Sequence, residues 1–260
     1  MSESDPSHDP STGPSPGSSP GSETGERSGA DPSARTADPF SPLVEKAIEI
    51  AAVWHDQTYR KGRWREEPFE SPGEDVLHIP VMAHLTSVGM TLQRAGWDEH
   101  TVAAGFLHDM IEDANRFRQR MSFERLRDLI GPEVARRVRA VSETKTDEEG
   151  SMRSWRTRKD EYLRTLMSAS PEAIAVSLAD KIHNLWTMNQ ALAEGIDVFE
   201  GDDQHRPLSE GPSEQYWFYS SVFQVSQLFD DPRLAPLRDR LERELGRFRD
   251  DHFAELDLED

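Results

Sequence analysis

The side chains best suited to chemistry lie in one short segment, residues 107–113. It holds an adjacent histidine and aspartate, His108 and Asp109, followed by an adjacent glutamate and aspartate, Glu112 and Asp113. In a helix continuing through this segment, residues four apart share a face, so His108 would lie beside Glu112 and Asp109 beside Asp113. The residues just before the segment are mostly apolar, and buried carboxylates are costly unless a cation or a hydrogen bond compensates them. The segment therefore predicts a metal site.

The composition of the chain limits the ligands and partners to be expected. The 260 residues include no cysteine, which excludes thiolate ligands and leaves imidazole and carboxylate. The formal net charge of −19 repels nucleic acid and anionic membranes, and it repels a phosphorylated substrate unless basic residues gather locally. Neither a long apolar run nor a secretory signal is found. We expect a cytoplasmic protein that binds no nucleic acid and no membrane, with its oligomeric state open.

The chain divides into a tail and a body. Residues 1–39 are rich in Ser, Pro, Gly and acidic residues and have little apolar surface to bury, so we expect a disordered tail. The body, 40–252, begins with a plausible helix cap at Ser41 and a proline at Pro42. Apolar spacing then predicts helices over 42–54, 80–95, 98–113, 122–130, 132–143, 153–168, 171–192, 213–229 and 234–250. Since no segment alternates persistently, we expect an all-α, single-domain helical bundle without a sheet.

Two further polar residues lie on predicted apolar helices. His84 follows an apolar helix start, and Asp180 lies between Leu178 and Ile182. A lone histidine in such a place is more often a structural core residue than a ligand, whereas a buried aspartate requires a partner. The residue types alone leave both interpretations open.

The order of these residues resembles the H…HD…D ligand pattern of the HD-domain metal-dependent phosphohydrolases. Within that group the strongest likeness is to the hydrolase domain of RelA/SpoT-type alarmone enzymes and to the small alarmone hydrolases. The likeness runs from about residue 43 to 192 and rests on five stretches: His55 to Gly62, Phe106 to Asp113 (F-L-H-D-x-x-E-D), Ile130 to Ala135, the Arg158-Lys159 pair, and Leu178 to Asn184 (L-A-D-K-I-H-N). Each stretch is weak alone, and their order makes the combination specific.

The resemblance implies a divalent ion, with Mn²⁺ expected, on four ligands: His84, His108, Asp109 and Asp180. Two imidazoles and two carboxylates suit such an ion, which activates water and screens phosphoryl charge. Glu112 is then expected to orient or deprotonate the attacking water, with Asp113 assisting. The implied reaction removes pyrophosphate from the 3′ position of (p)ppGpp, the alarmone of the stringent response, leaving GDP or GTP.

The same resemblance implies a nucleotide polyphosphate substrate, held by five residues: Arg60, Lys61, Arg158, Lys159 and Asn184. His55 and His183 also match family positions, and we interpret both as structural residues or as residues that support the metal ligands.

One departure from the family keeps other functions open. The chain carries an extra polar loop, 63–76, beside the expected base-binding side. This loop favours a second hypothesis, an HD phosphohydrolase that acts on a different nucleotide or phosphoester. A third hypothesis is a non-catalytic regulatory module, against which the intact Glu112-Asp113 pair argues.

Overall fold

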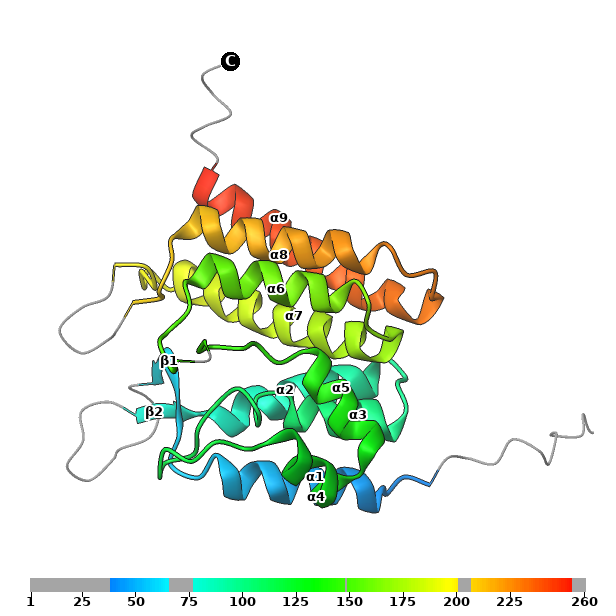
Figure 1. Cartoon of the computed structure of the whole chain (residues 1–260). Coiled ribbons are helices and arrows are strands. Elements are labelled where there is room, and N and C mark those ends of the chain that lie inside the picture. The colour runs from blue at the N-terminus through cyan, green and yellow to red at the C-terminus, as the bar shows by residue number, and fades with distance from the viewer. Residues whose placement is uncertain (1–37, 66–76, 148, 201–206, 254–260) are drawn as a thin grey trace, which may run out of the picture. The chain divides into compact units, whose positions relative to one another are not determined.

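The computed structural model describes residues 38–65, 77–147, 149–200 and 207–253, with the backbone alone described at 61–65 and 77. The described part contains nine α-helices: α1 (Pro42–Trp54), α2 (Val81–Arg94), α3 (Glu99–Leu107), α4 (Phe123–Ile130), α5 (Pro132–Ala140), α6 (Trp155–Leu166), α7 (Pro171–Ala193), α8 (Pro212–Ser226) and α9 (Ala235–Phe253). The mostly helical fold class is confirmed (Figure 1). Chain contacts divide the protein into 1–39 and Phe40–Asp260, and nearly all of the predicted tail lies outside the described residues.

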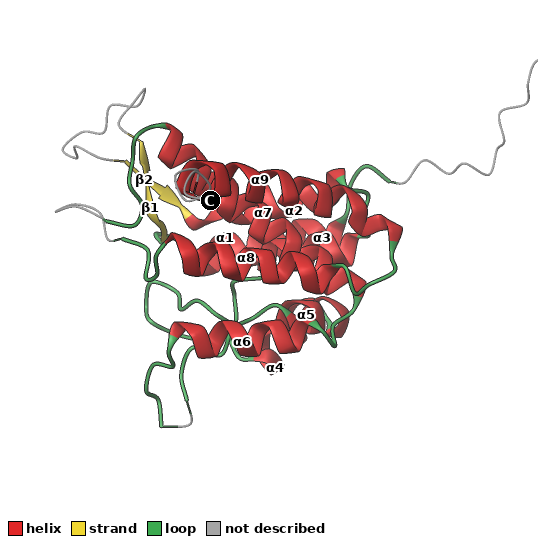
Figure 2. Cartoon of the chain, turned by 90° about the horizontal axis from the view of Figure 1, so that it is seen from above, coloured by secondary structure: helices red, strands yellow, loops and turns green. Residues whose placement is uncertain are grey.

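A short antiparallel ribbon corrects the expectation of a chain without strands. Strand β1 (Tyr59–Arg65) pairs with β2 (Leu77–Pro80), and the ribbon lies at one end of the helices (Figure 2). The β1 sequence is polar or basic at most positions, so the apolar alternation that predicts a strand is missing. Residues 66–76, most of the predicted extra loop, lie outside the described part. The ribbon leads directly into α2, where the Val81 amide donates to the Thr58 carbonyl at 2.9 Å.

Helix starts follow the predicted caps. The Ser41 hydroxyl accepts from the Val44 amide at 3.2 Å, and Pro42 takes the first helical position, as predicted. Ser170 and Pro171 repeat this arrangement at the start of α7. Within the described helices, none combines the length and apolarity that a membrane crossing requires.

Helix α7 is the centre of the bundle. It contacts α2, α3 and α5 on one side and α8 and α9 on the other (Figure 1). Most of its residues are buried, as expected for a helix that is apolar around nearly its whole circumference. A polar residue on α7 therefore faces protein rather than bulk water, and Asp180 is such a residue.

Helices α2 and α3 approach each other through glycines. A Cβ atom at Gly89 would lie 2.3 Å from the Phe106 ring, and one at Gly105 would lie 2.5 Å from a Leu92 methyl carbon. Neither position accepts a Cβ atom unless the facing side chain, Phe106 or Leu92, moves. The close contact fixes the spacing of the two helices that carry His84 and His108.

Candidate metal centre and active site

The segment after Leu107 is a turn, which corrects the predicted helix over 98–113. Helix α3 ends at Leu107, His108 is its C-terminal cap, and the next residues form turns in which the Asp113 amide donates to the Asp109 carbonyl at 2.7 Å. Carboxylates are unfavourable at the negative end of a helix, so three of them disfavour a continued helix here. The expected stacking of His108 on Glu112 along one helix face was therefore wrong.

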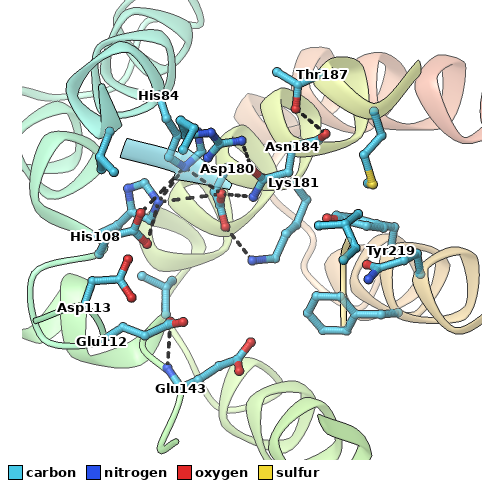
Figure 3. Close-up of a pocket in the computed structure, with 18 of the residues that line it drawn as sticks. His84, His108, Glu112, Asp113, Glu143, Asp180, Lys181, Asn184, Thr187 and Tyr219 are labelled. Atoms are coloured by element: carbon cyan, nitrogen blue, oxygen red, sulfur yellow. Dashed lines mark hydrogen bonds and ion pairs between the residues drawn. The ribbon is translucent and has the colours of Figure 1, made fainter. Parts of the chain in front are cut away.

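The four predicted metal ligands nevertheless meet at one place. His84 comes from α2, His108 and Asp109 from the end of α3, and Asp180 from α7. The His84 Nε2 atom lies 3.2 Å from both His108 Nε2 and Asp180 Oδ1. His108 Nε2 lies 3.2 Å from Asp109 Oδ1 and 3.6 Å from Asp180 Oδ1. Figure 3 shows His84, His108 and Asp180 pointing toward one another.

The hydrogen bonds of the two histidines leave their Nε2 atoms directed at this place. His108 Nδ1 lies 2.8 Å from the Gly105 carbonyl, which can only accept, so Nδ1 carries the proton. His84 Nδ1 lies 2.8 Å from His183 Nδ1, a contact that fits the supporting role predicted for His183. With neutral rings and protons on Nδ1, both Nε2 lone pairs face the carboxylates of Asp109 and Asp180. Four acceptors in this arrangement require a positive charge among them, supplied by a metal ion or, without one, by the second proton that Asp109 and Asp180 favour on His108 by raising its pKa.

The distances suit a divalent ion. Bonds of about 2.1 Å in octahedral geometry place neighbouring ligand atoms about 3.0 Å apart, somewhat less than the 3.2–3.9 Å between the Nε2 and carboxylate atoms of the cluster. His84, His108 and Asp109 can each offer one atom such that all three lie within 4.8 Å of one another. The donor set therefore fits a divalent metal ion.

The charged groups of the cluster shift one another's pKa values. Burial and the neighbouring carboxylates raise the pKa of Asp109 to about 7, against the attraction of His108. Burial lowers the pKa of His108, but Asp109 and Asp180 more than offset this and raise it to about 9. Burial alone would raise the pKa of Asp180, whereas the Lys181 ammonium and the two imidazoles hold it well below its usual range.

Glu112 and Asp113 line the same cavity and share a lysine. The Lys145 ammonium lies 3.1 Å from Glu112 Oε1 and 2.6 Å from Asp113 Oδ1. The Glu143 amide donates to the second Glu112 oxygen at 3.3 Å, and the Trp54 indole donates to the Asp113 carbonyl at 3.1 Å. Both carboxylates are thus held toward the cavity, and Lys145 is a site residue that the sequence analysis missed.

The cavity has a volume of about 340 Å³, and Arg60 and Asn184 connect its wall to the metal ligands. The Arg60 guanidinium donates to Asn184 Oδ1 at 2.8 Å, and the Asn184 amide donates to Asp180 Oδ1 at 2.5 Å. Two of the predicted substrate residues therefore join a predicted ligand in one chain of hydrogen bonds. The Lys61 side chain lies outside the described part.

Arg158 and Lys159 do not stand free in the cavity. Both donate to the buried Glu143 carboxylate, Arg158 at 2.8 Å and Lys159 in a closer contact. Lys159 belongs to the lining, whereas Arg158 is not among the described lining residues. The predicted pair of phosphate-binding cations thus already has an anionic partner within the chain.

Residues 141–145, which follow α5 and belong to no helix or strand, separate two cavities. Val141, Glu143 and Lys145 line the metal cavity, while Ser142 and Thr144 line a second cavity of about 450 Å³ beside α4, α5 and α6. Glu143 also contributes to the second cavity. Neighbouring side chains of this segment thus serve different cavities. The helix predicted over 132–143 ends instead at Ala140, which permits this alternation.

Comparison with known families and proteins agrees with this geometry. The family model described as "HD domain" matches residues 68–200. A probable guanosine-3′,5′-bis(diphosphate) 3′-pyrophosphohydrolase from Synechocystis sp. is 32% identical over 110 residues, which are 42% of this chain and 14% of that protein. The guanosine-3′,5′-bis(diphosphate) 3′-pyrophosphohydrolase MESH1 of Drosophila melanogaster is 31% identical over 140 residues, 54% of this chain and 66% of that protein.

Solved structures share the fold. The crystal structure of lmo0812 from Listeria monocytogenes EGD-e superposes with a TM-score of 0.51 at 28% identity, covering 62% of this chain and 90% of that one. A metazoan ortholog of SpoT, described as hydrolysing ppGpp, superposes with a TM-score of 0.55 at 23% identity, covering 81% of this chain and 99% of that one. The chain spans only 14% and 16% of the lengths of two curated relatives, one of them a Streptomyces coelicolor GTP pyrophosphokinase.

Proposed function

This chain belongs to the HD domain family, and on that premise we propose that it is a metal-dependent phosphohydrolase that removes pyrophosphate from the 3′ position of (p)ppGpp. The observation that carries the proposal is the convergence of His84, His108, Asp109 and Asp180 beside Glu112 and Asp113. The names of the pyrophosphohydrolase relatives support the choice of substrate.

The residues divide into three roles. The four converging side chains hold the metal, for which Mn²⁺ is our expectation. When bound, the metal supplies activation of water and screening of phosphoryl charge. Glu112 orients the attacking water and accepts its proton, since it lines the same cavity as the ligand cluster (Figure 3). Lys145 pairs with both Glu112 and Asp113 and holds them in place.

Basic residues on the cavity wall bind the phosphates of the substrate. Arg60 is oriented by Asn184, and Lys159 comes from α6. Charge-assisted hydrogen bonds from such groups contribute about 1.5–3 kcal/mol each. We propose Arg158 and Lys61 as further contributors, together with a cytoplasmic location, a domain spanning 40–252 and a solubilising tail over 1–39.

One observation favours a different substrate as the second candidate. The Lys159 and Arg158 cations are paired with Glu143, which reduces the positive charge available to a polyphosphate. A nucleotide or phosphoester with fewer charges fits such a wall better.

The test is turnover by the full chain with Mn²⁺ over a panel of ppGpp, nucleoside triphosphates and a generic phosphodiester. Release of pyrophosphate from ppGpp, lost in Asp109→Ala, supports the proposal. Turnover of another phosphoester with ppGpp untouched favours the second candidate. Bound metal without turnover of any compound would leave a regulatory module.

A further inference from the structure

We propose that Glu143 is a specificity-determining residue: its carboxylate is an internal anion on the cationic side of the cavity, which a phosphate group of the ligand must displace. The inference rests on the proposed function in one respect, since it takes the ligand to be a phosphate ester. It assigns a role to a residue that the proposed reaction does not use.

The contacts of Glu143 imitate those of a bound phosphate. One carboxylate oxygen accepts from Lys159 and the other accepts from Arg158 at 2.8 Å. The Glu143 side chain is only 4% exposed, so these charge-assisted bonds are shielded from water. Lys159, Lys181 and Arg158 more than offset the effect of burial and hold the pKa of Glu143 below its usual range, so it is an anion at neutral pH.

The charge balance of the cavity favours displacement. Its described lining includes four cationic side chains and five carboxylates. Each of its lysines already has a carboxylate partner: Lys145 has Glu112 and Asp113, Lys159 has Glu143, and Lys181 has Asp180. An incoming phosphate therefore competes with a carboxylate for any lysine on this wall.

Glu143 is the carboxylate that can be replaced. Asp109 and Asp180 lie in the metal cluster, and Glu112 and Asp113 are the groups proposed to handle water. Glu143 contacts none of the four metal ligands in any hydrogen bond or ion pair of the described part. The Arg158 Nε atom is buried without a hydrogen-bond partner among the described residues, so the carboxylate does not satisfy all donors of this cation. A phosphate, with more acceptor oxygens, can satisfy more of them.

The position of Glu143 in the fold suits this role. It lies on the 141–145 segment between the two cavities, and its own amide donates to Glu112. The backbone of Glu143 thus supports the water-handling group, while its side chain sets the charge offered to the ligand. Substitution of the side chain alone leaves the backbone contact in place.

The experiment measures binding of inorganic pyrophosphate to the metal-free full chain by calorimetry in the presence of a chelator. Glu143→Gln should lower the Kd by about tenfold or more, because a like charge is removed and two cations are released. The matched control is Glu133→Gln, which removes one exposed negative charge paired with Arg136 away from the cavity and should leave the Kd unchanged. In Glu143→Gln combined with Lys159→Gln, the gain should be lost.

An unchanged or higher Kd in folded Glu143→Gln overturns the proposal and makes Glu143 a positioning residue for Lys159 and Arg158. If that variant does not fold, Glu143→Asp serves instead, since it keeps the charge but shortens the reach and should give a smaller fall in Kd. Because no turnover is measured, the result is independent of the ppGpp assay. A tighter complex with pyrophosphate, together with inactivity toward ppGpp, would reject only the proposed function.

Discussion

Replacing Asp109 by asparagine should stabilise the metal-free protein and remove most of the stabilisation that the metal gives. Without an ion, the pKa of Asp109 is raised from 3.8 to about 7, so its charged form is unfavourable in the folded state. This cost to the free energy of unfolding is absent below pH 3.8, the pKa of Asp109 in the unfolded chain. It grows between pH 3.8 and 7 and is fully present at pH 8. The shift corresponds to about 2–4 kcal/mol. Asparagine keeps the shape and removes the charge, so metal-free Asp109→Asn should unfold at higher temperature than the native chain at pH 8.

With metal the difference in stability between the two proteins should narrow. At a Mn²⁺ concentration about 100-fold above Kd, binding stabilises the native chain by about 2.7 kcal/mol. The unit Phe40–Asp260 has an unfolding entropy of about 0.46 kcal/mol/K at about 2.1 cal/mol/K for each residue. The expected rise in Tm is therefore about 6 °C, and Asp109→Asn should lose most of it.

The assay is thermal unfolding by circular dichroism at pH 8, with chelator and with Mn²⁺. Asp128→Asn is the matched control, because it removes an exposed aspartate charge beside Arg127 and should leave both melting temperatures unchanged. A metal-free Asp109→Asn protein less stable than the native chain, or one that keeps the full Mn²⁺ shift, would refute the reasoning about the cluster.

Three further outcomes follow from the structure. Gly89→Ala should lower the free energy of unfolding by about 1–3 kcal/mol, because the added Cβ atom would clash with the Phe106 ring. A denaturant titration with an unchanged midpoint would contradict this. Burial lowers the pKa of His55 to about 4. The contribution of the neutral His55 ring to the free energy of unfolding is therefore complete above pH 6.5 and falls by about 3 kcal/mol toward pH 4. In parallel thermal melts, His55→Gln should lose less stability over that pH range than the native chain. Arg60→Ala should raise KM for the phosphate substrate by about tenfold or more, with kcat less affected, because it removes a charged donor that Asn184 orients. Equal KM values for the variant and the native chain would exclude Arg60 from substrate binding.

The metal ligands could be predicted from two features of the sequence: polar residues within apolar helices, and the order of these residues along the chain. His84 and Asp180 interrupt apolar helices, and such interruptions require partners. The structure brings both to within 3.2 Å of each other although the chain separates them by nearly a hundred residues. Their role as ligands remains a prediction that the metal experiment tests.

Tertiary pairing explains what the sequence analysis missed. Glu143 and Lys145 follow α5 in a segment without helical or apolar periodicity, so nothing local marks them as cavity residues. Arg158 and Lys159 were expected to face phosphate, but their partner Glu143 comes from a different element. The ribbon of β1 and β2 was missed for a related reason, since its pairing depends on backbone hydrogen bonds rather than on an apolar pattern.

The alternating lining of residues 141–145 ties the two cavities to one short stretch of chain. Val141 and Lys145 line only the metal cavity, Ser142 and Thr144 line only the second cavity, and Glu143 contributes to both. Deletion of Ser142, with the residues before it held in place, would move Glu143 and Lys145 to the positions that now face the second cavity, and Thr144 to the position of Glu143. The metal cavity would then lose two charged side chains and gain a hydroxyl at the position of Glu143, while the metal ligands stay untouched. A one-residue deletion here therefore changes two residues of the wall at once, which no single substitution does.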